Sequence, residues 1–136
     1  LGIVTSCKIS LGRAFVSYPG MVRVILENLI ENAIYFSEKT RPEIRLDALQ
    51  QGDHCLITVE DNGPGIDQAI RPHLFQMYFR GSERSKGNGL GLFIVRKAIE
   101  KLGGSVELDE EFTDGARFVL RIPMDREGFR QRQTEL

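Results

Sequence analysis

The chain has 136 residues, of which 41% are hydrophobic and 27% are charged, values that fit one soluble globular domain with its own core. A net charge of −1 gives no general attraction to nucleic acids or membrane surfaces, and no apolar run approaches the roughly 20 residues that span a bilayer. Cys7 and Cys55 lie far apart, without His or Cys partners at ligand spacing, which argues against a metal site and favours a reducing compartment.

Short runs rich in apolar and β-branched residues predict strands along the whole chain. They lie at residues 2–10, 14–17, 41–49, 54–60, 105–110 and 116–123. A hairpin turn is expected between the third and fourth runs, at residues 50–53.

Apolar residues at three- and four-residue steps predict two longer helices. The first covers residues 21–37, after a break at Pro19 and Gly20, with an apolar face of Val22, Ile25, Leu26, Leu29, Ala33 and Phe36. The second follows the glycines near residue 90 and presents Leu92, Val95, Ile99 and Leu102, and a shorter helical stretch is expected within residues 68–75. This order predicts an α+β fold, a two-layer sandwich in which one sheet carries helices on a single face.

Asn28 and Asn32 are four residues apart and so project from the same face of the first helix. A carboxamide oxygen can bind a hard cation such as Mg²⁺, which usually keeps several waters and bridges to substrate phosphates. The neighbouring Glu27 and Glu31 also allow a simpler reading, in which this is a solvated polar face.

The segment EDNGPGI, residues 60–66, follows directly after a predicted strand. Gly63 and Gly65 allow a sharp turn and the close approach of a flat ligand, and Asp61 could accept a hydrogen bond from an exocyclic amine. An ordinary Asp-Asn-Gly turn is the alternative.

The segment GNGLGL, residues 87–92, leads into the second helix, where free amides favour anions. It fails the dinucleotide fingerprint, because Leu92 occupies the third glycine position, and it lacks the Walker pattern. Arg80, Arg84 and Lys86 lie just upstream and could counter phosphate charge, or could simply solubilise a surface loop.

Together, and in this order, the three segments resemble the catalytic and ATP-binding domain of sensor histidine kinases, in the superfamily shared with type II topoisomerases and MutL-type repair ATPases. ENLIENAIYFS resembles the N box, DNGPGI the G1 box, LFQMYFRG the F box, GNGLGL the G2 box and GARFVLRIP the final strand, over roughly residues 14–123. The resemblance implies a Bergerat ATP-binding fold with a mixed sheet, and ATP and Mg²⁺ as cofactors.

The resemblance also assigns roles by position. Asn32 would bind Mg²⁺, Asn28 would lie near the phosphates, and Asp61 would bind the adenine amine. Residues 80–88 would form a short, moving lid, and Arg80 would approach the γ-phosphate during transfer. The implied nucleotide-binding set is Asn28, Asn32, Tyr35, Asp61, Gly63, Gly65, Ile66, Arg80, Arg84, Lys86, Gly87, Asn88, Gly89, Leu90, Gly91 and Leu92.

Two positions depart from the family pattern. Tyr35 stands where members often carry Lys, so one phosphate contact is missing unless Arg84 or Lys86 replaces it. Ala116 stands where Ser or Thr is common, which removes a hydroxyl near the adenine.

The resemblance favours phosphoryl transfer over hydrolysis. ATP-hydrolysing relatives carry a Glu one turn before the Mg²⁺-binding Asn, and that position here is Asn28. Neither His54 nor His73 is followed by the acidic residue that follows the family's acceptor histidine. We therefore expect the acceptor histidine on a separate dimerisation domain.

The resemblance implies a two-component sensor kinase in the cytoplasm. We expect the chain to be a piece of a longer protein, because it begins at Leu1 rather than Met. We expect a domain at residues 1–123 and a polar tail or linker at residues 124–136. The isolated piece is expected to be monomeric, to act indirectly on a response regulator, and to contact neither nucleic acid nor membrane. The alternatives are a degenerate nucleotide-binding or scaffolding module and a serine kinase of the anti-sigma-factor type.

Overall fold

The computed structural model of the chain describes residues 3–36, 41–76 and 90–126. The strands are β1 (Val4–Ser10), β2 (Glu43–Gln51), β3 (His54–Asp61), β4 (Ser105–Leu108) and β5 (Arg117–Pro123). The helices are α1 (Pro19–Phe36) and α2 (Gly91–Lys101), with a short 3₁₀ turn at Arg71–His73. Within these residues, no helix has the length and apolarity that a membrane crossing requires.

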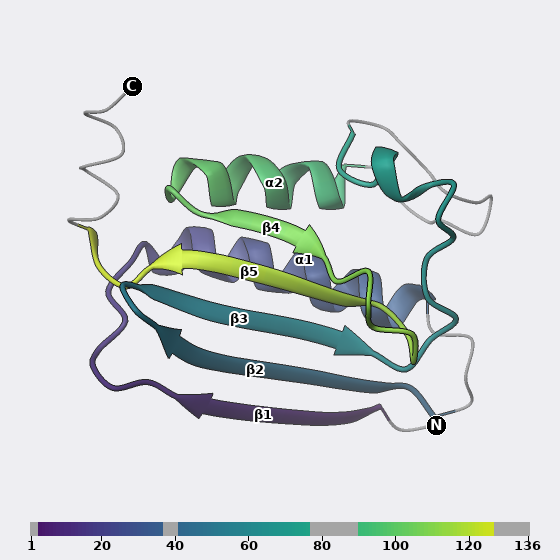
Figure 1. Ribbon diagram of the computed structural model, residues 1–136, viewed down its shortest axis with the longest axis horizontal. Coiled ribbons are helices and arrows are strands. Elements are labelled where there is room, and N and C mark those ends of the chain that lie inside the picture. Colours follow the sequence, from purple (N-terminus) through teal and green to yellow (C-terminus); the bar gives the residue numbers. More distant parts are fainter. Residues whose placement is uncertain (1–2, 37–40, 77–89, 127–136) are drawn as a thin grey trace.

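The strands form one mixed sheet in the order β1-β2-β3-β5-β4. β1 and β2 run parallel, and the other neighbouring pairs run antiparallel. The β2–β3 hairpin turns at Gly52, whose φ of 60° suits a residue without a side chain. Both helices cover the same face of the sheet (Figure 1), so the predicted α+β two-layer sandwich is confirmed.

The core lies between the sheet and the two helices. Alternate residues of β3, namely Cys55, Ile57 and Val59, are buried, because successive side chains of a strand point to opposite faces. The buried residues facing them from α1 and α2 follow the helical period: Ile25, Leu29, Ala33, Val95 and Ile99. Both predicted helix faces therefore pack as expected, apart from Phe36, whose side chain lies outside the described part.

The strand predicted at residues 14–17 is wrong. This stretch connects β1 to α1, and Val16 forms one backbone hydrogen bond, from its N–H to the Met124 carbonyl at 2.8 Å, rather than a ladder. Phe15 is partly buried against the core. The apolar residues that suggested a strand thus serve to pack a connection.

Two helix boundaries also differ from the prediction. α1 begins at Pro19 rather than at residue 21, and the Tyr18 carbonyl accepts hydrogen bonds from the N–H groups of Met21 and Val22. Proline is tolerated there because the first turn of a helix has no internal partner for its N–H. The short helix expected within residues 68–75 is reduced to the 3₁₀ turn.

Residues 124–126, predicted from the sequence to belong to a polar tail, lie against the domain. Met124 is fully buried, and its N–H donates to the Asp53 carbonyl at 2.8 Å. Asp125 accepts a hydrogen bond from Arg13 at 3.1 Å, and the guanidinium of Arg126 lies 4.6 Å from the centre of the Tyr18 ring.

α2 offers a matched test of this packing. Ile99 is fully buried, whereas Ile94 on the same helix is 38% exposed. We expect Ile99→Ala to lower the free energy of unfolding by about 2–5 kcal/mol, because it leaves a cavity in the core. Ile94→Ala should change it by only about 0.5 kcal/mol. Urea titrations of the two variants measure both effects, and equal losses would contradict the assigned orientation of α2.

Candidate functional site

Three predicted motifs meet at one end of the sandwich. The end of β3, the second half of α1 and the first residues of α2 lie at the same end of the molecule (Figure 1). Gly91, the first residue of α2, lies against Asn28, because a Cβ at Gly91 would be 3.3 Å from the Asn28 Oδ1. The fold therefore brings parts of the N, G1 and G2 segments together.

The Asp61 carboxylate is held in place by backbone hydrogen bonds. It is the last residue of β3, and its Oδ1 accepts hydrogen bonds from the N–H groups of Gly63, at 2.9 Å, and Ala116, at 3.3 Å. Among the described residues, Oδ2 has no hydrogen-bond donor. One carboxylate oxygen is thus fixed by the backbone, while the other remains available to a ligand.

Burial raises the pKa of Asp61 above its ordinary value, and the adjacent Glu60 adds a smaller push in the same direction. The two backbone N–H groups oppose this rise, because they stabilise the ionised form. The site therefore keeps a partly desolvated carboxylate at the end of a strand.

Two glycines bring the backbone close to this carboxylate. A side chain at Gly115 would collide with the backbone carbonyl of Asp61, so the turn before β5 can approach β3 only with glycine there. Gly65 has a φ of 80°, which strains any residue with a Cβ, and its missing Cβ would lie 3.2 Å from the Gly115 carbonyl oxygen. Gly63, which stands between Asp61 and Gly65 in the sequence, is buried as well.

The loop that follows β3 is fixed on the sheet by apolar contacts. Leu74 is buried, and the ring of Phe75 meets that of Phe118 on β5 edge to face, with centroids 6.1 Å apart. Arg71 donates from Nε to the carbonyl of Ile66 at 3.0 Å, which ties the turn back to the G1 segment.

The polar residues of α1 divide between two sides of the helix. The Asn28 Nδ2 donates to the Val24 carbonyl at 2.8 Å, which leaves its Oδ1 beside Gly91. The Asn32 side chain is partly buried and has no hydrogen bond within the described ranges. Glu27 instead accepts a hydrogen bond from Arg23 at 2.8 Å.

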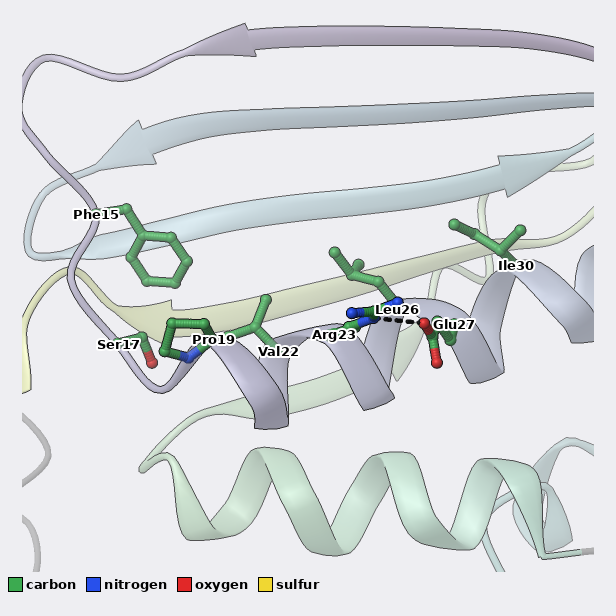
Figure 2. A pocket seen from close by; sticks show the side chains of 8 residues that line it. All are labelled: Phe15, Ser17, Pro19, Val22, Arg23, Leu26, Glu27 and Ile30. Atoms are coloured by element: carbon green, nitrogen blue, oxygen red, sulfur yellow. Dashed lines mark hydrogen bonds and ion pairs between the residues drawn. The ribbon is translucent and has the colours of Figure 1, made fainter.

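An apolar groove of about 450 Å³ lies between α1 and the sheet and is open to solvent (Figure 2). The ion pair of Arg23 and Glu27 lies at this groove. The groove is lined by Phe15, Ser17, Pro19, Val22, Arg23, Leu26, Glu27 and Ile30. None of the residues predicted to bind nucleotide belongs to this lining. The groove and the candidate site are therefore different places.

The remaining predicted site residues fall into two groups. Tyr35, Leu90 and Leu92 are partly buried, and Leu90 precedes the first turn of α2, where its carbonyl accepts a hydrogen bond from the Ile94 N–H at 2.8 Å. The others lie outside the described residues: Arg80, Arg84, Lys86, Gly87, Asn88 and Gly89.

Sequence reasoning missed two residues that shape the site. Gly115 has no local signal in the sequence, because its role comes from the close approach of the turn before β5 to the Asp61 carbonyl. The Asp-Asn-Gly pattern predicts only a turn role for Asn62, although its side chain bonds to the backbone of Arg41 and Glu43 at the start of β2. The sequence marks Asn62 only as the second residue of the DNGPGI segment.

The donor set suits a cation that arrives with phosphates. Within residues 3–36, 41–76 and 90–126, no group of three or more His, Cys, Asp or Glu side chains could hold a metal. Mg²⁺ in phosphate sites is typically held by one or two protein oxygens together with the phosphates and water. The Asn32 carboxamide oxygen fits that kind of ligand.

Comparison with known proteins places the chain in a family. Residues 18–126 match the family described as histidine kinase-, DNA gyrase B- and HSP90-like ATPase. The chain is 35% identical over 100 residues to the alginate biosynthesis sensor protein KinB of Pseudomonas aeruginosa, covering 74% of this chain and 17% of KinB.

Solved structures show the same fold. The mycobacterial sensor histidine kinase MprB gives a TM-score of 0.74 at 22% identity, covering 88% of this chain and 83% of that chain. Full-length ShkA in complex with AMPPNP gives a TM-score of 0.73 at 28% identity, covering 90% of this chain and 26% of ShkA.

The chain thus spans only 17% of the length of KinB and 26% of the ShkA chain. The family match nevertheless includes both helices, β3 and β5, which carry the described part of the site. The chain belongs to the histidine kinase-, DNA gyrase B- and HSP90-like ATPase family, and it corresponds to the ATP-binding catalytic domain of sensor histidine kinases.

Proposed function

We propose that this domain binds ATP with Mg²⁺ between the end of β3 and the start of α2, and presents the γ-phosphoryl group to a histidine on a separate domain. The observation that carries the proposal is the Asp61 carboxylate. Its Oδ1 is held by two backbone N–H groups, and its Oδ2 is left for a donor from a ligand. An adenine amine is a donor of the required kind.

The contact between α1 and α2 supports a phosphate position beside the adenine. Gly91 brings the first turn of α2 against Asn28, and the free N–H groups of a helix start favour anions. Asn32 lies one turn further along α1 and would share the Mg²⁺ with the phosphates. Bound there, Mg²⁺ would neutralise phosphate charge as the transferred group leaves ADP.

The charges on α1 support transfer rather than hydrolysis. Glu27 pairs with Arg23 beside the apolar groove, on a different side of the helix from the Asn28 contact with Gly91. A carboxylate turned away from the phosphates is poorly placed to activate water. A neutral imidazole needs no such base to attack.

The acceptor would lie on another part of a longer sensor kinase. His54 opens β3 in a ladder position opposite Pro123, and His73 lies in the 3₁₀ turn, so each has a place in the fold. We propose a dimerisation domain carrying the histidine and a response regulator as the later recipient. This arrangement would operate in the cytoplasm, where ATP is supplied.

Asp61→Asn tests the adenine contact. The Asn Oδ1 can keep both backbone hydrogen bonds, which places the Nδ2 donor where the ligand amine also donates. We expect ADP affinity, measured by calorimetry, to fall about 10- to 100-fold. Asp53→Asn makes the same change in the turn before β3 and should bind like the wild type, since the Asp53 side chain is 97% exposed and distant from the site. Equal ADP affinity for Asp61→Asn and the wild type would remove the main support for the proposal.

Asn32→Ala tests the metal contact. With a non-hydrolysable ATP analogue, we expect the gain in affinity on adding Mg²⁺ to shrink about tenfold or more, because one ligand to the ion is lost. Binding without Mg²⁺ should be unchanged. Glu31→Ala alters the adjacent exposed residue and is the control. An Mg²⁺ effect of wild-type size in Asn32→Ala would exclude Asn32 as a ligand.

The raised pKa of Asp61 predicts a trend of stability with pH. Because burial raises the folded-state pKa above the unfolded value, the folded protein binds more protons between the two values. The contribution of Asp61 to stability is therefore present at low pH and is lost as pH rises through this window. We expect the free energy of unfolding of the wild type, minus that of Asp61→Asn, to fall as pH rises from the ordinary carboxyl range to neutrality. Urea titrations at several pH values measure this difference, and a rise instead of a fall would contradict the assigned cause.

A further inference from the structure

Where β3 leaves the sheet, a side-chain oxygen replaces a backbone acceptor on its β5 side. In an antiparallel ladder, every second pair of opposite residues exchanges two backbone hydrogen bonds, each N–H donating to the partner's carbonyl. The register pairs Glu60 with Arg117, and one residue further on the Asp61 N–H donates to the Ala116 carbonyl at 2.9 Å. The return bond, from the Ala116 N–H, goes to the Asp61 side-chain Oδ1 at 3.3 Å rather than to the backbone carbonyl.

The next residue repeats this pattern on the β2 side. The register pairs Asp61 with Ile44, and one residue further on the Asn62 N–H donates to the Glu43 carbonyl at 3.2 Å. The Glu43 N–H donates to the Asn62 side-chain Oδ1 at 2.9 Å. The Asn62 Nδ2 then donates to the Arg41 carbonyl at 3.3 Å. Two successive side chains thus take over ladder bonds on the two sides of one strand.

These bonds free the backbone to turn immediately after Asp61. The main-chain carbonyl of Asn62 is not needed by Glu43, so the chain can bend into Gly63 without leaving a β2 donor unpaired. Asp61 is then held from β5 through Ala116 and from β2 through its neighbour Asn62. The orientation of its free oxygen depends on both attachments.

We propose that Asn62 is a positioning residue for nucleotide binding, which acts by anchoring the end of β3 to β2 and so aiming the Asp61 carboxylate. This inference rests on the proposed function of the site. Asn62 itself does not contact the ligand, because its Oδ1 and Nδ2 are both directed at the backbone of residues 41 and 43. Its effect on binding must therefore pass through Asp61.

Gln50 provides a matched control at the opposite end of β2. Its Oε1 accepts a hydrogen bond from the Gly12 N–H at 2.9 Å, and its Nε2 donates to the Gly52 carbonyl at 3.2 Å. It therefore makes the same two kinds of side-chain bond to backbone, away from Asp61. Gln50→Ala reports what the loss of such a pair does to the fold alone.

The test is ADP binding by calorimetry to the whole 136-residue chain, compared among the wild type, Asn62→Ala, Asn62→Asp, Gln50→Ala, Asp61→Asn and the double variant Asp61→Asn/Asn62→Ala. We expect Asn62→Ala to weaken ADP binding about tenfold, the size of one lost hydrogen bond. Asn62→Asp keeps the acceptor for the Glu43 N–H and should recover most of the affinity. Gln50→Ala should bind like the wild type.

The double variant separates positioning from a general effect on folding. If Asn62 acts through Asp61, Asn62→Ala should weaken binding little further once Asp61 is Asn. Urea titrations would record the stability of each variant alongside. Should Asn62→Ala not fold, Asn62→Asp still decides the matter, because it must fold and bind close to the wild type.

The outcomes distinguish this inference from the proposed function. A wild type that does not bind ADP would overturn both. A wild type that binds, with Asp61→Asn weakened and Asn62→Ala unchanged, would overturn the role of Asn62 alone. Equal weakening by Asn62→Ala and Gln50→Ala, or fully additive losses in the double variant, would assign Asn62 to folding only.

Discussion

The way in which β3 ends is the constraint on which the candidate site depends. A sheet requires nearly every backbone N–H and carbonyl to be paired, and a ligand site requires polar atoms that are not. Asp61 meets both requirements, because one carboxylate oxygen replaces a ladder acceptor for Ala116 and the other is left over. The carboxylate that would bind the ligand is thus also part of the sheet, and the hydrogen bonding of the sheet fixes its position.

That arrangement has a thermodynamic cost, which appears in the pKa of Asp61. A carboxylate held at the end of a buried strand is partly desolvated, and two hydrogen bonds offset only part of this. A donor from a ligand would supply the interaction that the free oxygen lacks. The ionised form of Asp61 is therefore less stable in the folded protein before a ligand binds than after it binds.

The side chains of α1 serve different roles because successive residues of a helix point about 100° apart. Ile25 and Leu29 are buried against the sheet and hold the helix in place. Asn28 faces the start of α2, and Glu27 faces the groove with Arg23. Because the core fixes the rotation of the helix, it also decides which polar side chains reach the site, so the core and the proposed choice of reaction are linked.

Much of this architecture is readable in the sequence, since local patterns dominate it. The alternation in β3 and the helical period of α1 each report a buried face directly. The failures are of a different kind. Residues 14–17 have the composition of a strand, but they pack as a connection, and composition does not show whether a neighbouring strand is available. Asn62 and Gly115 gain their roles from the register between strands far apart in the chain.

The contrast between Gly115 and Ala116 shows what kind of information such a register carries. Ala116 lacks the hydroxyl that Ser or Thr would supply, yet its contact with Asp61 is made by the backbone N–H, which every residue except proline has. The anchoring of Asp61 is therefore indifferent to that substitution. At Gly115 the opposite holds, because any side chain would collide with the Asp61 carbonyl. Whether a position in this turn tolerates change thus depends on which of its atoms faces β3, not on how close it lies to the ligand.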